Sequence, residues 1–343
     1  MKAMILAGGL STRLYPLTRQ VPKPLVPIAD IPNAVHLIGY LRSAGITEIA
    51  INVHYLASRI EAALGDGSRF GVRLEYLYEE ELLGSAGAVK QMEAFFGDED
   101  FIVVGCDDLT DLSLDALLGV HAESGAYATI GLVERDEVDQ YGVVVCDTNG
   151  RIIEFQEKPA RGTERSHLVN TGIYAFSPDI FEFIPAAQFY DFGKQVFSDL
   201  LHHHAPFYGY DAKDAYWCDI GTLGEYRRAT RDVLSGKLTL PDVQVGIHAS
   251  AQVHPDAQIR GPVLIASQAQ IHAGAKIVGP TVIGSGAVIG LNAVVTESIV
   301  WHGAHVGEHA RVRDAILGID YRVADGATLE SIAVAEEVTV ARP

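Results

Sequence analysis

The sequence predicts an α/β domain with a mostly parallel sheet, followed by a stack of short parallel strands. From residue 1 to about 236, short apolar runs alternate with segments whose apolar residues recur about every 3.6 positions, as in strand–helix units. From about residue 237, an aliphatic residue recurs at every sixth position instead. We therefore predict two domains, 1–236 and 237–343.

Each element of the first domain follows from a short stretch of sequence. Strands are expected at "AMILA", "EIAINV", "VRLEYLY" and "FIVVG", and helices at "NAVHLIGYLRSAG", "ASRIEAALGDG" and "SAGAVKQMEAFFG". Gly45 is a plausible stop for the first of these helices. This alternation implies a parallel sheet covered on both faces, with ligands binding at the carboxyl ends of its strands. Residues 8–25 follow the first strand and occupy that position.

Two interleaved series predict the second domain. The aliphatic series comprises Ile247, Val253, Ile259, Ile265, Ile271, Ile277, Ile283, Ile289 and Val295, and a small residue stands two before most of them: Ala251, Ala257, Ala269, Ala275, Ala287 and Ala293. A helix cannot keep a six-residue repeat on one face, whereas a coil of short parallel strands can. A meander of ordinary strands is the alternative. The register slips by one near Trp301 and resumes at Val306 and Val312.

Composition excludes several functional classes. The 343 residues are 48% apolar and 20% charged, with a net charge of -18, which opposes binding to nucleic acid. No apolar run reaches the roughly 18–20 residues of a membrane span, and the N-terminus has no leader-like pattern. Cys106, Cys146 and Cys218 are sparse and lack metal-ligand spacing. We therefore expect a cytoplasmic protein without nucleic-acid or membrane partners.

The first 29 residues are an exception to the acidic balance, because they contain Lys and Arg but no Asp or Glu. The stretch "AGGLSTRLYPLT" is neither a Walker loop nor a dinucleotide fingerprint. Glycines let a backbone approach a phosphate closely, Arg13 can bind phosphate oxygens bidentately, and Lys23 stands between two prolines that stiffen its backbone. These features predict a phosphate site; a purely structural turn at Gly8 and Gly9 is the alternative.

Acidic residues follow a later apolar strand. "FIVVGCDDLTD" runs into Asp107, Asp108 and Asp111, and "AYWCDIGT" contains Asp219. Carboxylates of this kind suit a hard cation such as Mg²⁺, whereas an acidic loop that caps the next helix is the structural alternative. Glu157 and Lys158 in "FQEKP" read, on their own, as a solvated charge pair at a strand end.

These motifs together resemble a known family. The stretches "GGLSTRLYPLT" and "PKPLVPI" are similar to the signature of the sugar nucleotidyltransferases, usually GGxGTRLxPLT followed by PKPL. The resemblance continues in the family's order through "EEELLGSAGAVK", "GCDDLTD", "YGVVV", "FQEKP", "VNTGIY" and "WCDIGT", and is nearest the mannose-1-phosphate guanylyltransferase branch. It implies a Rossmann-like nucleotidyltransferase domain, then a left-handed parallel β-helix, in an enzyme that forms an NDP-sugar from an NTP and a sugar 1-phosphate.

The resemblance also implies roles for individual residues. The metal ligands for Mg²⁺ would be Asp107 and Asp219, and the catalytic group adds Arg13, Lys23 and Lys158. The expected nucleotide-binding residues are Ala7, Gly8, Gly9, Ser11, Thr12, Arg13, Lys23, Glu79 and Gly84. The expected sugar-phosphate-binding residues are Gly142, Glu157, Lys158, Asn170 and Thr171.

Base choice allows one argument from chemistry. Guanine presents two adjacent hydrogen-bond donors, which suit a carboxylate side chain. Uracil and thymine present one N–H donor between acceptors, which suits an amide side chain. The stretch "YEEELLGSAGA" carries Glu79, Glu80 and Glu81 and no Gln, so Glu79 is a candidate for the guanine edge. A solvent-facing acidic run is the alternative. We expect GTP and a hexose 1-phosphate, mannose 1-phosphate first, as substrates.

Other functions stay open. The base and sugar can differ, as in a glucose-1-phosphate uridylyl-, thymidylyl- or adenylyltransferase. Ser11 and Cys106 replace the family's usual glycines, so a silent regulatory paralogue that senses an NDP-sugar is a rival. An acyltransferase in the repeats would use histidines of that region: His248, His254, His272, His302, His305 and His309. The open strand edges of a coil stack lead us to expect a homo-oligomer, with the β-helix oligomeric or regulatory.

Overall fold

The computed structural model describes residues 1–335 of the chain. It contains two compact units. The first consists of Met1–Leu10 and Leu37–Asp219, and the second of Ser11–His36 together with the chain from Ile220 on. The second unit thus contains the β-helix and also part of the predicted catalytic domain. The sequence-domain boundary at 236/237 stays a prediction.

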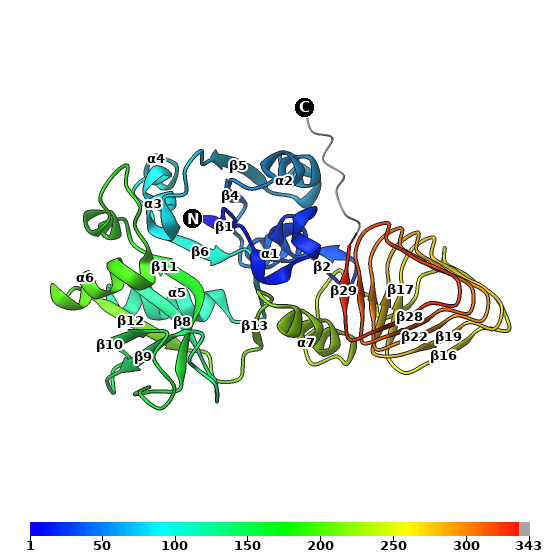
Figure 1. The fold of residues 1–343 in the computed structure, drawn as a ribbon. Helices are drawn as coiled ribbons and strands as arrows, with labels where there is room; N and C mark the ends of the chain where they lie inside the picture. The colour runs from blue at the N-terminus through cyan, green and yellow to red at the C-terminus, as the bar shows by residue number, and fades with distance from the viewer. Residues whose placement is uncertain (336–343) are drawn as a thin grey trace. The chain divides into compact units, whose positions relative to one another are not determined.

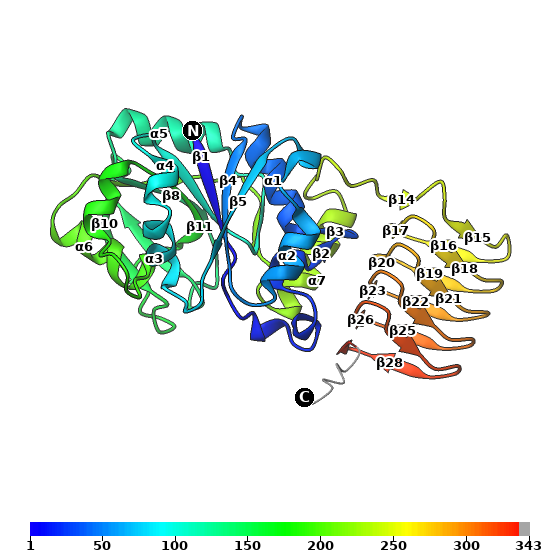
Figure 2. The same cartoon turned by 90° about the horizontal axis from the view of Figure 1, so that it is seen from above.

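The core of the first unit is the parallel sheet that the sequence predicts. Strand β1 (Lys2–Leu6) lies between β4 (Glu48–Val53) and β6 (Phe101–Gly105), and β5 (Arg73–Tyr78) flanks β4 (Figures 1 and 2). All three of these pairings are parallel. The expected strands are therefore confirmed, and their carboxyl ends lie at one edge of the sheet.

The other half of the nine-stranded sheet is built differently. Strand β11 (Leu168–Phe176) runs antiparallel to β6, β8 (Ala128–Glu134) and β9 (Gly142–Cys146). A short connection makes β9 and β10 (Ile152–Glu157) an antiparallel pair, while β12 (Phe207–Asp211) is parallel to β8. The sheet as a whole is therefore mixed around a parallel core, because hairpin-length connections allow antiparallel neighbours.

Helices connect these strands at the expected places. The predicted helix "SAGAVKQMEAFFG" is interrupted at Met92 and forms two short helices. The helices are α1 (Asn33–Ser43), α2 (Ala57–Leu64), α3 (Gly84–Gln91), α4 (Glu93–Phe96), α5 (Leu114–Ser124), α6 (Phe197–His202) and α7 (Leu223–Leu234). Short stretches of tighter or wider helix are η1 (Thr12–Leu14), η2 (Leu17–Arg19), η3 (Lys23–Leu25), η4 (Ser68–Phe70), η5 (Pro178–Phe183) and η6 (Phe192–Val196). Gly45, two residues after α1, has φ +78°, a conformation that favours glycine, which supports its role as the stop.

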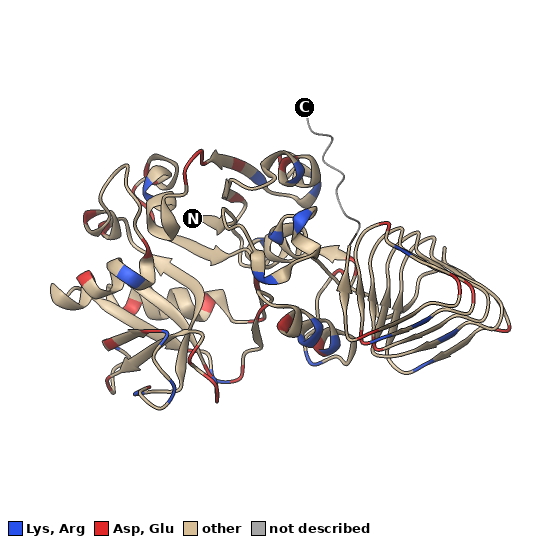
Figure 3. Ribbon diagram, in the orientation of Figure 1, with Lys and Arg blue, Asp and Glu red and all other residues tan. Residues whose placement is uncertain are grey.

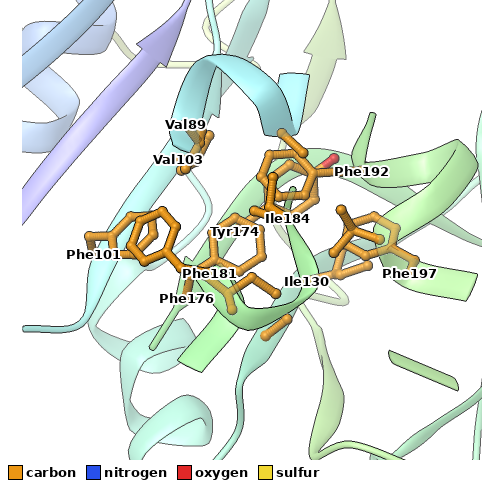
Figure 4. Packing of buried hydrophobic residues seen from close by; sticks show 14 of the residues in the cluster. Val89, Phe101, Val103, Ile130, Tyr174, Phe176, Phe181, Ile184, Phe192 and Phe197 are labelled. Carbon is orange, nitrogen blue, oxygen red and sulfur yellow. The ribbon is translucent and has the colours of Figure 1, made fainter. Parts of the chain in front are cut away.

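Aromatic side chains fill the core of the first unit. Phe101 and Phe181 stack with their ring centroids 5.4 Å apart, and Phe176 stacks on Phe192 at 4.8 Å. Figure 4 shows these rings packed with Tyr174 and Phe197 against the sheet. Large buried rings contribute strongly to stability, so this core holds the strand ends in place.

The repeats form a coil of parallel strands, as predicted. Figure 2 shows the coils stacked one upon another. Three ladders line the coil. The first comprises β14 (Gly246–Ile247), β17 (Val263–Ile265), β20 (Thr281–Ile283), β23 (Ile299–Val300), β26 (Ile316–Leu317) and β29 (Ala333–Val334). The second comprises β15 (Gln252–Val253), β18 (Gln270–Ile271), β21 (Val288–Ile289), β24 (His305–Val306) and β27 (Arg322–Val323). The third comprises β16 (Gln258–Arg260), β19 (Lys276–Val278), β22 (Val294–Thr296), β25 (Arg311–Arg313) and β28 (Thr328–Glu330).

The register slip near Trp301 marks a change in coil length. Ile265 pairs with Ile283, eighteen residues on, whereas Ile283 pairs with Val300, seventeen residues on. The later coils keep the shorter length, since Val300 pairs with Leu317 and Leu317 with Val334. The slip is therefore a corner shortened by one residue in each later coil. Both the aliphatic and the small residues of the central repeats are buried inside the coil.

Charged residues are distributed over both units. Figure 3 shows acidic positions on both units, and α7 carries residues of both signs. Within residues 1–335, no helix combines the length and the apolar character needed to cross a bilayer.

Candidate active site

A buried polar cluster holds the carboxyl ends of β1, β4 and β5 together. The Asn52 side chain at the end of β4 accepts a hydrogen bond from the backbone N–H of Ala7 at 2.8 Å and donates one to Glu79 Oε2 at 2.6 Å. The other carboxylate oxygen of Glu79 accepts from the N–H of Leu83 at 3.1 Å. Buried polar groups are paired in stable proteins, and here the pairing fixes the start of the glycine loop.

Two predicted glycines are required by this packing. A Cβ atom on Gly8 would lie 2.8 Å from both Asn52 Nδ2 and Glu79 Oε2. Gly84 has φ +75°, and a Cβ there would lie 2.5 Å from the carbonyl oxygen of Tyr190. By contrast, a Cβ on Gly9 would have open space around it. Gly8 and Gly84 therefore have structural reasons to be glycine, whereas the surrounding packing does not require glycine at Gly9.

The acidic run at Glu79 divides into two parts. Glu80 and Glu81 are exposed, as the solvent-facing alternative expects. Glu79 is instead 6% exposed, and both of its carboxylate oxygens accept hydrogen bonds from the protein. A contact between Glu79 and a guanine base stays a prediction. It would have to use the lone pairs of the Glu79 carboxylate that do not accept the hydrogen bonds from Asn52 and Leu83.

The acidic residues at 107–111 and 219 come together through a two-stranded ladder. Strand β7 (Asp108–Thr110) pairs antiparallel with β13 (Trp217–Asp219), and Asp219 lies directly opposite Asp108. Asp107 immediately precedes β7. Residues far apart in sequence thus lie together in the first unit, while the role of Asp107 and Asp219 as metal ligands stays a prediction.

Asp108 is the buried centre of this acidic group. Its carboxylate accepts hydrogen bonds from the indole N–H of Trp217 at 3.0 Å and from the N–H of Gly105 at 2.9 Å. Burial, followed by the negative charge of Asp107, raises the pKa of Asp108 well above its usual range, and the charge of Asp219 adds to this effect. Like charges close together disfavour ionisation, and the β7–β13 ladder sets Asp219 directly opposite Asp108.

This donor set fits a hard divalent cation. Mg²⁺ takes one or two protein carboxylates and completes its shell with water and substrate phosphates. Asp107 and Asp219 are half-buried beside Asp108, and a cation there would offset their mutual repulsion. Within residues 1–335 there is no cluster of three or more His, Cys, Asp or Glu side chains suited to a metal. The site therefore suits Mg²⁺ shared with phosphate rather than a metal enclosed by protein.

The predicted sugar-phosphate residues gather around the β9–β10 pair. Gly142 lies directly opposite Glu157, and the N–H of Lys158 donates to the carbonyl of Tyr141 at 3.1 Å. A Cβ on Gly193 would lie 2.7 Å from Glu157 Oε2. Burial raises the pKa of Glu157, and Lys158 opposes that rise. Glu157 thus lies between two glycine backbones, and both Glu157 and Lys158 are exposed, as expected for a solvated charge pair at a strand end.

Asn170 and Thr171 lie where β11 changes register. The Asn170 amide donates to the hydroxyl of Tyr174 at 3.0 Å, while the buried hydroxyl of Thr171 donates to the carbonyl of Gly131 at 2.7 Å. In the same β-bulge Gly172 has φ +81°, and a Cβ there would lie 3.2 Å from Asp108 Oδ2. The bulge therefore brings the backbone next to Asn170 and Thr171 close to the Asp108 carboxylate.

The basic residues of the glycine loop lie in the second unit. Arg13 is exposed in η1, and Lys23 is half-buried at the start of η3. Ser11 has φ 53°, so serine occupies the left-handed conformation in which the family's glycine is favoured. The predicted convergence of Arg13 and Lys23 with Asp107 and Asp219 spans the two units and stays a prediction.

Sequence reasoning missed three residues that position the site. Asn52 links β1, β4 and β5, Trp217 supports Asp108, and Arg135 lies over the Trp217 ring at 5.3 Å. Asn52 has a detectable signal, because it is a polar residue inside the apolar run "EIAINV". Trp217 and Arg135 have none, since their partners are distant in sequence.

The chain is similar to known proteins over most of its length. Residues 2–236 match the nucleotidyl transferase family, and residues 259–342 match the family described as the GMPPB C-terminal domain. The chain is 39% identical to the UTP–glucose-1-phosphate uridylyltransferase of Synechocystis sp., over 92% of this chain and 87% of that protein. It is 31% identical to the mannose-1-phosphate guanylyltransferase of Mycobacterium tuberculosis, over 77% and 74%. A mannose-1-phosphate guanyltransferase of Gibberella zeae is 32% identical, over 99% and 92%.

A solved structure has the same fold. It is a putative glucose-1-phosphate thymidylyltransferase from Bacillus anthracis, in complex with a sucrose, with a TM-score of 0.61 and 26% identity. The match covers 70% of this chain and 96% of the other. The chain therefore belongs to the nucleotidyl transferase family, and within it to the sugar-1-phosphate nucleotidyltransferases.

Proposed function

We propose that this protein forms an NDP-sugar and pyrophosphate from a nucleoside triphosphate and a hexose 1-phosphate, with Asp107 and Asp219 as its metal ligands. The supporting observation is the β7–β13 ladder, which sets Asp219 opposite Asp108, the residue that follows Asp107. The β11 bulge contains Asn170 and Thr171 and lies close to the Asp108 carboxylate at Gly172, which also supports the proposal. A nucleotide and a sugar phosphate would then meet at one acidic point.

In the proposed reaction, an oxygen of the sugar 1-phosphate attacks the α-phosphorus in line, the bond to the β-phosphate oxygen breaks, and pyrophosphate leaves with that electron pair. Displacements of this kind depend mainly on positioning and charge neutralisation. Arg13 and Lys23 would bind the triphosphate and stabilise the leaving group. Lys158 would reduce the repulsion between the anionic nucleophile and the nucleotide. The Glu157 carboxylate would accept hydrogen bonds from hydroxyl groups of the sugar.

Asp107 and Asp219 would hold Mg²⁺, which supplies charge neutralisation at the α-phosphate and the leaving group. Asp108 would keep the two ligands in place, because Trp217 and Gly105 fix its own carboxylate. The backbone at Gly8 and Gly9, Ala7, Ser11 and Thr12 would line the triphosphate. Asn170 would contact the sugar phosphate, while the buried Thr171 hydroxyl would shape the turn beside it.

For the substrates, we propose GTP and mannose 1-phosphate. The match of residues 259–342 to the GMPPB C-terminal domain supports this choice, as do the relatives named mannose-1-phosphate guanylyltransferase. The carboxylate of Glu79 at the predicted base loop suits the adjacent donors of guanine.

A uridylyltransferase acting on glucose 1-phosphate is the second candidate. The Synechocystis relative with this name is 39% identical, more than the two mannose-1-phosphate relatives above. The geometry of Glu79 also favours it, because both carboxylate oxygens already accept hydrogen bonds from Asn52 and Leu83. Under this alternative Glu79 supports the loop and does not read the base.

A matrix assay tests both candidates. Four NTPs are combined with mannose, glucose and galactose 1-phosphates in the presence of Mg²⁺, with pyrophosphate release and product mass as readouts. The proposal expects the highest kcat/KM for GTP with mannose 1-phosphate, and the second candidate expects it for UTP with glucose 1-phosphate. Binding of NDP-sugars without turnover of any pair would instead favour the silent regulatory paralogue.

We further propose that the protein works in the cytoplasm as a homo-oligomer. The reduced cysteines support the first point, because none of the three is in a disulfide in the described structure. The second rests on the first coil of the β-helix, where β14 pairs on one side alone and Ile247 is 51% exposed. Light scattering after size exclusion measures the mass, and a monomer at micromolar concentration would contradict an oligomer.

A further inference from the structure

Polar contacts tie the β-helix to the segment that contains Lys23. That segment continues from η3 into a hairpin formed by β2 (Pro27–Ile28) and β3 (Ile31–Pro32). The hairpin, helix α7 and the β-helix all belong to the second compact unit. The contacts run from Trp301 through Tyr226 to Pro27, and from Ser285 to Asp30.

The first connection is a buried relay of two hydrogen bonds. The indole N–H of Trp301 donates to the hydroxyl of Tyr226 at 2.8 Å, and that hydroxyl donates to the carbonyl of Pro27 at 2.7 Å. Trp301 is 2% exposed and Tyr226 is fully buried. Because an indole N–H can only donate and a carbonyl can only accept, the direction of both bonds is fixed.

The second connection holds a strained turn. Ala29 and Asp30, which join β2 to β3, have φ values of 52° and 70°. The left-handed conformation is unfavourable for a non-glycine residue and persists where its surroundings fix it. Here the Asp30 carboxylate accepts from the N–H of Ser285 at 3.1 Å, and a Cβ on Gly284 would lie 2.8 Å from Asp30 Oδ1. The β-helix backbone therefore supplies part of the support for the turn.

The hairpin in turn controls the backbone of Lys23. The N–H of Val26 donates to the carbonyl of Lys23 at 3.1 Å, and the N–H of Asn33, after the hairpin, donates to the carbonyl of Val26 at 3.1 Å. Pro22, Pro24 and Pro27 fix φ along the same stretch. Because these prolines restrict the segment, we expect a displacement of Pro27 to shift the backbone of Lys23 as well.

We infer that Tyr226 and Trp301 are positioning residues for Lys23, so that the β-helix is part of the support of the active centre. This inference rests on the proposed role of Lys23 in binding the triphosphate. Loss of the relay lets the Lys23 segment move away from its reactive position. A displacement of about an ångström is enough to reduce turnover strongly.

A double-mutant cycle tests the inference in the full-length protein. Tyr226→Phe removes both hydrogen bonds while keeping the ring, and Trp301→Phe removes the indole N–H. Each is measured alone and combined with Lys23→Ala, with kcat and KM for the NTP as readouts. We expect Tyr226→Phe to lower kcat about tenfold in the wild-type background and less than about twofold when Lys23 is absent.

The matched control is Thr230→Val. Thr230 lies one turn further along α7, and its buried hydroxyl donates to the carbonyl of Tyr226 at 3.0 Å. This variant should lose similar stability and keep its turnover, which separates positioning from general destabilisation. If Tyr226→Phe does not fold, Trp301→Phe is judged by the same criterion.

The outcomes separate this inference from the proposed function. If Lys23→Ala alone leaves turnover intact, the proposed role of Lys23 fails and the inference falls with it. If Lys23→Ala lowers turnover but the relay variants reduce it equally in both backgrounds, the inference alone is overturned. No change in kcat for either relay variant in the wild-type background also overturns it.

Discussion

The carboxyl-end edge of the sheet and the interior of the β-helix use opposite kinds of interaction. At the sheet edge, buried polar groups such as Asn52, Glu79 and Asp108 are paired across long sequence separations. In the β-helix, an aliphatic residue stacks on the equivalent residue of the neighbouring coil, as Ile265 does on Ile283. The polar pairing at the sheet edge keeps charged side chains in defined positions. The aliphatic stacking in the β-helix builds a rigid body with few functional groups inside.

The comparison shows where chemistry is possible. Buried charge needs specific partners, so each polar residue at the sheet edge is individually important. A stacked aliphatic interior needs only side chains of suitable volume at regular spacing, and many residues each contribute part of its stability. Substitutions of the stacked aliphatic residues should therefore affect stability, whereas substitutions of the acidic residues at the sheet edge should affect catalysis.

The largest expected effect is on turnover. Replacing Asp107 by Ala should lower kcat at least about a hundredfold, the scale of one lost electrostatic contact, with the fold intact. Pyrophosphate release measures turnover, and circular dichroism checks the fold. The control is Asp98→Ala, at an exposed aspartate of the same unit. Near-normal release from Asp107→Ala would contradict the proposed metal site.

A second variant sharpens the β-helix side of the comparison. Ile265→Ala removes a fully buried side chain from the coil interior and should lower the free energy of unfolding by about 2–5 kcal/mol. Ile247 pairs directly with Ile265 in the same ladder but is 51% exposed, so Ile247→Ala is the matched control. Urea unfolding measures both, and equal losses would show that the stack interior is not what stabilises the coil.

A third variant tests the polar edge of the sheet. Asn52→Ala leaves the N–H of Ala7 and the carboxylate of Glu79 without their partner, and should reduce stability by about 1–3 kcal/mol. Exposed Asn149 provides the control through Asn149→Ala. If Asn52→Ala is as stable as the control, the cluster is not the structural link that its geometry indicates.

The smallest expected effect is a pH dependence at Asp30. Burial raises the pKa of Asp30, although Ser285 and the charge of His302 lower it in part. A raised pKa means that the folded state binds the proton more tightly, so this contribution to stability is full below the unfolded pKa and is lost as pH rises through the folded one. Relative to Asp30→Asn, the wild type should therefore lose unfolding free energy as the pH rises above about 4, the ordinary pKa of an aspartate.

Chemical denaturation at several pH values measures this difference. The same series in a His302→Gln background removes the charged neighbour that faces Asp30 from the β-helix. If the wild type instead gains unfolding free energy relative to Asp30→Asn as the pH rises, the hydrogen bond from Ser285 stabilises the ionised Asp30 carboxylate by more than burial destabilises it.

Local patterns predicted much of the fold for a physical reason. The six-residue repeat fixes which side chains enter the coil, because each residue pairs with its equivalent one coil away, and no long-range information is needed. The strands β1, β4, β5 and β6 were likewise predicted from apolar runs and alternation. The antiparallel half around β11 was not, because short apolar strands give no indication of the direction of their neighbours.

The candidate site was predicted in part. The motifs named Asp107 and Asp219 through resemblance, and the β7–β13 ladder now places Asp219 beside the Asp107–Asp108 pair. The burial of Glu79, and its engagement by Asn52, were not predicted, because an acidic run looks the same in sequence whether it faces water or a cluster.

By itself the sequence determined the periodic elements and the family, because periodicity and motif order are local properties of the chain. The tertiary structure alone decided that Trp217 supports Asp108 across 109 residues and that Trp301 reaches Pro27 through Tyr226. A hydrogen bond between distant residues depends on where the whole backbone brings them, and no spacing in the sequence records that distance.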